Sequence, residues 1–323
     1  MKILIDCFGC DNPEDFISGI PAAISESPEA TLVVAGDKAR IEKLLEGKDF
    51  DRDRLEFIDA PDIITNQDSP VMAIRRKTSS SLVQGYRALR DRDDLPIMIT
   101  AGNTGAIIAG SVLILGREDR DIQPTLVTFI PNDKGETTCL TDCGANVDCR
   151  PEHLVKFARY ASDYMRTVYG KPSPRVALLS VGTEDEKGNA QSKETFALLR
   201  ESGLNFVGNM EAKSALSGDF EVIVADGFSG NVLLKSIEGT TKSIVKLMAG
   251  LIKKHAGEGA DLSYLKSAIG ELNCTLDFNT MGGAVILGAK KPVIKAHGSA
   301  NADTLVNTVK QALKIVNTKK SIQ

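Results

Sequence analysis

The sequence predicts an α/β fold, a mixed and mainly parallel β-sheet with helices on both faces. Apolar strand-like runs alternate with helical patterns through most of the 323 residues, as is typical of parallel sheets. Two hairpin-like pairs interrupt this alternation, so antiparallel strands are expected as well. No low-complexity linker or internal repeat divides the chain, so we expect residues 1–323 to form one α/β module of two interleaved lobes with a cleft between them.

The expected strands are short runs rich in Val, Ile and Leu. Six of them belong to the alternating part: Lys2–Asp6, Thr31–Gly36, Leu55–Asp59, Ile97–Thr100, Arg175–Ser180 and Glu221–Ala225. The two antiparallel pairs are Thr125–Ile130 with Thr137–Thr141, and Ala284–Leu287 with Pro292–Ala296. Ser69 and Pro70 read as the N-cap and first residue of a helix that reaches about Arg90.

The strand Ile97–Thr100 leads into a turn of small residues that opens a further helix. Gly102 and Gly105 would let the backbone approach a ligand, while Asn103 or Thr104 would cap the helix. The first N–H groups of a helix lack internal partners and lie at the positive end of its dipole. The turn is therefore expected to hold a phosphate or another oxyanion.

Composition excludes several classes of protein. The formal net charge is −4, from 39 basic and 43 acidic residues, which argues against nucleic acid as the main partner. No apolar run is long enough to span a bilayer and no signal peptide precedes the first strand, so we expect a cytoplasmic location. The cysteines, among them the pair Cys7 and Cys10, lack the spacing of a zinc site, so no metal is expected.

Most expected strands end in loops that combine glycine with Asp, Asn, Ser or Thr. These loops are 6–11, 101–105, 141–146, 181–189, 226–231 and 295–299. Ligands of open α/β sheets bind at the carboxyl ends of the strands. Six such loops therefore predict a polar cleft.

Seven motifs follow one another along nearly the whole chain: Asp68–Val71, Arg75–Lys77, Ala101–Ala106, Asp142–Asp148, Lys187–Asn189, Asp226–Val232 and Lys295–Ser299. With this set the sequence resembles the phosphate acyltransferases of bacterial phospholipid synthesis, the PlsX family. The first loop departs from the usual Asp-Ala-Met-Gly-Gly-Asp of that family, because Cys7, Phe8 and Cys10 replace Ala, Met and the second Gly. This departure bears on acyl-chain preference more than on the reaction.

The resemblance implies transfer of a long-chain fatty acyl group from acyl carrier protein to inorganic phosphate, which gives an acyl phosphate for phospholipid synthesis. It also implies a fold similar to isopropylmalate dehydrogenase and phosphotransacetylase. A cytoplasmic homodimer associated peripherally with the inner membrane is expected, without a cofactor.

Attack of phosphate on a thioester requires a protein that holds phosphate, stabilises the tetrahedral oxyanion and eases departure of the thiolate. No Gly-x-Ser-x-Gly elbow is present, so direct attack by bound phosphate is the simpler hypothesis. His297 is the first catalytic candidate because it follows a strand and could donate to the oxyanion or protonate the sulfur. A structural role for it is the alternative. Lys187 and Asp226 complete the catalytic set.

The residues expected to bind substrate lie in the strand-end loops, apart from one arginine in the helix after Ser69. They are Asp6, Asp11, Arg76, Gly102, Asn103, Thr104, Gly105, Asp142, Asn146, Asn189, Gly230, Asn231, Lys295 and Ser299. The helix 231–255 carries lysines on one face and Leu, Ile and Met on the other. It is interpreted as a core-facing helix, as a weak contact to the membrane surface, or as a docking face for acyl carrier protein.

Three other functions stay open on the sequence alone. A CoA-dependent phosphate acetyl- or butyryltransferase would use the same chemistry with a different donor. A metal-dependent decarboxylating dehydrogenase would share the fold, although the sequence contains no Gly-x-Gly-x-x-Gly after a strand. The altered loop 6–11 is the one feature that favours a binding scaffold without turnover.

Overall fold

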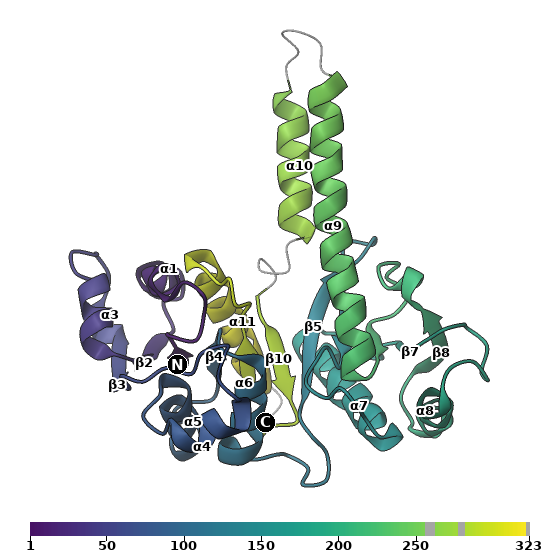
Figure 1. Cartoon of the computed structure of the whole chain (residues 1–323), viewed down its shortest axis with the longest axis horizontal. Coiled ribbons are helices and arrows are strands. Elements are labelled where there is room, and N and C mark those ends of the chain that lie inside the picture. Colours follow the sequence, from purple (N-terminus) through teal and green to yellow (C-terminus); the bar gives the residue numbers. More distant parts are fainter. Residues whose placement is uncertain (256–261, 277–281, 321–323) are drawn as a thin grey trace.

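The computed structural model describes residues 1–255, 262–276 and 282–320, apart from the side chains of 273–276 and 319–320. Within these residues, 11 strands form one sheet in the order β3-β2-β1-β4-β11-β10-β5-β6-β9-β7-β8 (Figure 1). The strands are β1 (Lys2–Asp6), β2 (Thr31–Gly36), β3 (Leu55–Asp59), β4 (Met98–Thr100), β5 (Thr125–Pro131), β6 (Thr137–Thr141), β7 (Val176–Ser180), β8 (Phe206–Glu211), β9 (Val222–Val224), β10 (Ala284–Leu287) and β11 (Val293–Lys295). The predicted α/β class with a mixed, mainly parallel sheet is confirmed.

The pairing of the strands divides the sheet into two groups that run in opposite directions. Strands β1, β2, β3, β4 and β11 are parallel to one another, as are β6, β7, β8 and β9. Between the groups, β10 is antiparallel to both β11 and β5, and the hairpin β5–β6 reverses the chain. The carboxyl ends of the two groups therefore lie at opposite edges of the sheet. The expectation that all six loops share one cleft at these ends is wrong.

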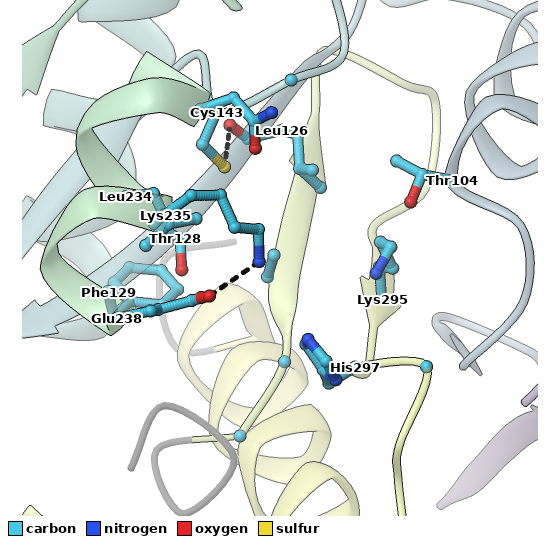
Figure 2. A pocket seen from close by; sticks show the side chains of 16 residues that line it. Thr104, Leu126, Thr128, Phe129, Cys143, Leu234, Lys235, Glu238, Lys295 and His297 are labelled. Atoms are coloured by element: carbon cyan, nitrogen blue, oxygen red, sulfur yellow. Dashed lines mark hydrogen bonds and ion pairs between the residues drawn. The ribbon is translucent and has the colours of Figure 1, made fainter. Parts of the chain in front are cut away.

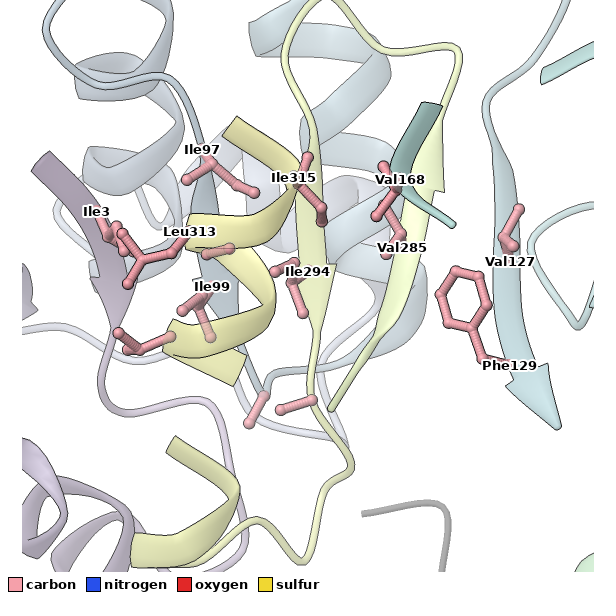
Figure 3. Packing of buried hydrophobic residues seen from close by; sticks show 14 of the residues in the cluster. Ile3, Ile97, Ile99, Val127, Phe129, Val168, Val285, Ile294, Leu313 and Ile315 are labelled. Atoms are coloured by element: carbon pink, nitrogen blue, oxygen red, sulfur yellow. The ribbon is translucent and has the colours of Figure 1, made fainter. Parts of the chain in front are cut away.

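Helices cover both faces of the sheet, since side chains alternate along each strand. They are α1 (Pro13–Ser18), α2 (Ile20–Glu26), α3 (Lys38–Leu44), α4 (Pro70–Arg76), α5 (Ser81–Asp91), α6 (Thr104–Gly110), α7 (Pro151–Val168), α8 (Ala190–Glu201), α9 (Gly227–His255), α10 (Ser263–Leu276) and α11 (Ala302–Lys320). On one face, Ile3, Ile99 and Ile294 belong to the same buried cluster as Leu313 of α11 (Figure 3). Leu4 and Met98 point to the other face, where they share a second buried cluster with Tyr86 of α5.

The single helix expected from Pro70 to about Arg90 is instead two helices, α4 and α5. Lys77 ends α4, and its ammonium donates to the Asp68 carboxylate at 2.8 Å and to the carbonyl of Ile63 at 2.8 Å. Ser80 then starts α5 by accepting a hydrogen bond from the N–H of Val83. Arg76 consequently lies at the exposed end of α4 and does not line the cavity described below. The prediction that it binds substrate is not supported by its position.

Helix α9 begins at Gly227, before the predicted start at 231, because Asp226 caps it. The Asp226 carboxylate accepts from the N–H of Ser229 at 2.7 Å. The far part of α9 extends away from the sheet and packs against α10 (Figure 1). There Ile244, Leu247 and Leu251 are 50%, 65% and 55% exposed. No helix in the described part of the chain has the length and apolar composition needed to cross a bilayer.

Gly230 allows α9 to pack directly against the end of β6. A Cβ atom at position 230 would lie 1.9 Å from the carbonyl oxygen of Asp142, which is backbone and cannot move aside. Gly230 was predicted to bind substrate, but this close approach explains the glycine without a ligand. Gly239 on the same helix has nothing within 4 Å of such an atom.

We predict opposite effects of alanine at these two positions. Gly230→Ala should lower the free energy of unfolding by about 1–3 kcal/mol, because overpacking displaces α9. Gly239→Ala should raise it by about 0.5–1 kcal/mol through helix propensity. Denaturant unfolding followed by circular dichroism measures both, and equal effects would contradict the close approach of α9 to Asp142.

Candidate active site

A cavity of about 420 Å³ lies between α9 and the adjoining face of the sheet (Figure 2). Strands β5, β10 and β11 form its floor with Thr128, Ala284 and Lys295, and α9 contributes Asn231, Lys235 and Glu238. The start of α6, which follows β4, adds Thr104, and the loops after β6 and β11 add Gly144 and His297. The cavity therefore crosses the sheet and reaches loops of both strand groups. It brings together four of the predicted site residues: Thr104, Asn231, Lys295 and His297.

Lys295 places a cation on the cavity floor. It is the last residue of β11 and pairs in register with Thr100 of β4. Its Nζ donates to the carbonyl of Ala296 at 3.2 Å, and no carboxylate of the described residues lies within salt-bridge distance. Burial lowers the pKa of the Lys295 ammonium below its ordinary value. An anion bound beside this group would offset that cost by favouring the charged form.

A second cation and a carboxylate face the cavity from α9. Lys235 and Glu238 are one helical turn apart, and their Nζ and Oε2 atoms are 2.7 Å apart (Figure 2). The Glu238 side chain is only 17% exposed, against 53% for Lys235. Because Glu238 offsets Lys235, the charge of Lys295 leaves the cavity with an excess of positive charge.

His297 lies at the mouth of the cavity with a defined set of hydrogen bonds. Its Nδ1 accepts from the N–H of Ser299 at 3.3 Å and lies 2.8 Å from the Ser299 hydroxyl. This pattern favours the neutral tautomer that carries its proton on Nε2. Burial of part of the ring, and then the charges of Lys295 and Lys235, lower the pKa of His297. The ring is therefore suited to donate a hydrogen bond from Nε2, and Ser299 orients it rather than binding substrate.

Asp142 and Asn146 hold the loop after β6 in place. The buried Asp142 carboxylate accepts from the N–H groups of Leu126, Ala145 and Asn146 and from the Asn146 side-chain amide, at 2.6–3.1 Å. The Asn146 amide also donates to the carbonyl of Pro124 at 2.9 Å. Both residues were predicted to bind substrate, and their polar atoms are instead used within the protein.

Asp6 and Asp11 stand behind the cavity rather than in its lining. Burial raises the pKa of Asp6, whose carboxylate accepts from the Thr100 hydroxyl at 2.7 Å. Asp11 lies beside the loop of His297, since its N–H donates to the carbonyl of Gly298 at 2.8 Å. The Asp6 carboxylate and the Asp11 backbone thus support the strand ends that carry Lys295 and His297.

Most residues of the turn after β4 make structural contacts that explain why these residue types occur there. Asn103 caps α6 by accepting from the N–H of Ala106 at 3.0 Å. Gly9 packs closely against Gly102, since a Cβ atom at position 9 would lie 2.5 Å from the Gly102 Cα atom, and Gly105 allows close approach of Pro70. Thr104 is the member of this turn that lines the cavity. Gly102, Asn103 and Gly105 do not line the cavity, so the prediction that they bind substrate gains no support from this geometry.

A second pocket of about 300 Å³ lies at the carboxyl ends of β7 and β9 and contains two further predicted residues, Asn189 and Asp226. Asn189 caps α8 by accepting from the N–H of Ser192 at 2.8 Å, much as Asp226 caps α9. Lys187 precedes this cap and lines neither pocket. Of the predicted catalytic set, the cavity thus contains His297 but not Lys187 or Asp226.

Sequence reasoning missed Glu238 and did not assign Lys235 to a site. A signal existed, because Glu238 is the one acidic residue between Gly227 and His255 and follows Lys235 by one helical turn. Among the described side chains, no group of three or more His, Cys, Asp and Glu residues could hold a metal ion.

Comparison with known proteins gives matches along the whole chain. A family model described as "Fatty acid synthesis protein" covers residues 1–322. The phosphate acyltransferase of Clostridioides difficile (strain 630) is 39% identical over 315 residues, which are 97% of this chain and 92% of that protein. The phosphate acyltransferase of Brevibacillus brevis is 40% identical over 317 residues, 98% of this chain and 94% of that protein.

Solved structures show the same fold in more distant proteins. A phosphotransacetylase from Streptococcus pyogenes has a TM-score of 0.62 at 15% identity, covering 98% of this chain and 94% of that chain. The EutD phosphotransacetylase from Staphylococcus aureus has a TM-score of 0.60 at 17% identity, covering 97% and 94%. These two likenesses concern the fold alone.

The relatives that match along the whole chain argue against two of the three alternative functions. Neither the dehydrogenase nor the scaffold without turnover agrees with full-length relatives that are named for phosphate acyl transfer. The predicted resemblance and the predicted enzyme class are both confirmed. The chain belongs to the phosphate acyltransferase (PlsX) family, whose members are enzymes of fatty acid and phospholipid synthesis that transfer an acyl group to phosphate.

Proposed function

We propose that this enzyme transfers a long-chain fatty acyl group from acyl carrier protein to inorganic phosphate in the cavity between β11 and α9. The supporting observation is Lys295, a largely buried cation without a carboxylate partner among the described residues. Removing a charge from water is unfavourable unless a counter-charge accompanies it. Phosphate bound against Lys295 would provide that charge, and Lys235 lies on the facing wall.

In this proposal, phosphate itself attacks the thioester carbonyl. The new C–O bond forms, the C–S bond breaks, and the proton of hydrogen phosphate ends on the departing thiol. Nε2–H of His297 donates to the tetrahedral oxyanion or to the sulfur as negative charge develops there. The lysines hold the attacking anion, so positioning and charge stabilisation provide most of the rate enhancement.

The first test is thiol release from palmitoyl-acyl carrier protein with and without phosphate. His297→Ala should lower kcat by about 10²–10³-fold, the usual cost of one lost oxyanion donor. Lys295→Met should mainly raise the KM for phosphate. His255→Ala, at the exposed end of α9, is the matched control and should leave both constants unchanged.

The same assay can reject the proposal. Full activity of His297→Ala would show that His297 is not catalytic and has a structural role. Turnover with acetyl- or butyryl-CoA but not with the carrier-protein thioester would favour the CoA-dependent phosphate acetyl/butyryltransferase.

His297 should also report on anion binding through its titration. Without phosphate its pKa should lie below 6.5, as expected from burial and the neighbouring lysines. Phosphate should raise this pKa, because an adjacent anion favours the imidazolium. As pH falls through about 6.5, the unfolded chain takes up this proton first, so the folded state loses stability. NMR of the ring, assigned with His297→Gln, measures the pKa, and Tm should fall less on acidification in that variant.

We further propose that the enzyme is a homodimer and touches the inner-membrane surface weakly through α9. The support is the exposed row of Ile244, Leu247, Met248 and Leu251 on an extended helix that also carries lysines. Apolar side chains beside cations suit a surface of anionic lipids. The same lysines would aid the approach of an acidic carrier protein.

Replacing Leu251 and Ile252 together by Gln should abolish co-sedimentation with vesicles that contain phosphatidylglycerol, while Tm stays unchanged. Raised salt should weaken binding of the unaltered protein. The control replaces Val71 and Val207, each 46% exposed on the body of the molecule, by Gln and should keep binding. Equal loss in both double variants would argue against a contact through α9.

A further inference from the structure

Glu238 is a carboxylate in a cavity that, under the proposed function, receives an anion. Its Oε2 pairs with Lys235, and no hydrogen bond to Oε1 occurs within the described residues. The side chain is 17% exposed and lines the same cavity as Lys295 and His297 (Figure 2). Its charge acts on both of these residues, since it opposes the lowering of their pKa values. An anion bound in this cavity would therefore share its space with the Glu238 carboxylate.

A carboxylate only accepts hydrogen bonds, so it repels an anion that has no proton to donate. Near neutral pH, inorganic phosphate keeps at least one P–OH group, whereas sulfate of the same shape and size keeps none. A phosphate that directs its P–OH group at Glu238 gains a charge-assisted hydrogen bond. Sulfate in the same place would set one of its oxygens against the carboxylate. Discrimination of this kind depends on repulsion as much as on attraction.

We propose that Glu238 is a specificity-determining residue that recognises the protonated oxygen of phosphate and thereby excludes sulfate from the cavity. This inference rests on the proposed function, because it requires that phosphate bind there. The lysines attract either tetrahedral anion, and Glu238 decides between them.

A purely structural role would be to hold Lys235 in position. The variant Glu238→Gln separates the two roles, because its amide oxygen can still accept from Lys235 while its NH₂ group can donate to an unprotonated oxygen. If Glu238 only positions Lys235, the affinities for phosphate and sulfate should move in the same direction. If Glu238 recognises the P–OH group of phosphate, the affinities for phosphate and sulfate should move in opposite directions.

The experiment measures the KM for phosphate and the inhibition constant of sulfate in phosphate-dependent thiol release at neutral pH. We expect Glu238→Gln to raise the KM for phosphate about tenfold or more and to lower the inhibition constant of sulfate by a similar factor. Glu238→Asp, which keeps the charge, should still exclude sulfate. Glu194→Gln, an exposed glutamate of α8, controls for net charge and should change neither constant.

Two results would overturn the inference. One is an unchanged inhibition constant of sulfate in Glu238→Gln, and the other is a parallel shift of both constants. Sulfate and phosphate binding by calorimetry gives the same comparison should Glu238→Gln be inactive. Absence of phosphate-dependent thiol release in the unaltered enzyme would instead refute the proposed function, so the two failures are distinguishable.

Discussion

The contact between the end of β6 and the first turns of α9 determines how the cavity is built. The Asp142 carboxylate gathers four hydrogen bonds and thereby fixes the loop 142–146. Gly230 then packs against the carbonyl of Asp142, while the N–H of Gly227 donates to the carbonyl of Asn146 at 2.8 Å. These contacts position α9 so that Lys235 and Glu238 face β11 across the cavity. A turn held by the buried Asp142 carboxylate thus orients side chains of α9 that lie two and three helical turns away.

The charges in the cavity are arranged so that an anion completes them. Lys295 comes from the sheet and Lys235 from α9, so the two cations approach one space from different elements. Glu238 compensates only the more exposed lysine, which leaves the buried one without a carboxylate. Partial burial of the ring, and then the charges of the two lysines, lower the pKa of His297. Lys295, Lys235, Glu238 and His297 line the same cavity, so the charge of each acts on the others and on any bound anion.

The sequence was sufficient for most of the fold and for less of the site. Both hairpins and all the described strands except β8 could be predicted because apolar periodicity and turn residues are local signals. The break between α4 and α5 could not, because it depends on the distant carbonyl of Ile63 that binds Lys77. Local patterns also could not reveal that the hairpin β5–β6 reverses the chain, so that the carboxyl ends of the two strand groups lie at opposite edges of the sheet. Lys295 and His297 could be selected as candidates because they lie at the end of a strand, whereas Glu238 lies within a helix and carries no such local signal.

Three of the predicted site residues that lie outside the main cavity act as helix caps, for a shared physical reason. Asp and Asn next to glycine at a strand end are favoured both by ligand sites and by helix N-caps. In this chain Asn103, Asn189 and Asp226 use their side-chain oxygens to cap α6, α8 and α9. Their short side chains bind the nearest backbone N–H groups and so cannot reach across a cavity of this size. The longer side chains of Lys295, Lys235 and Glu238 extend past the backbone that anchors them and line the cavity.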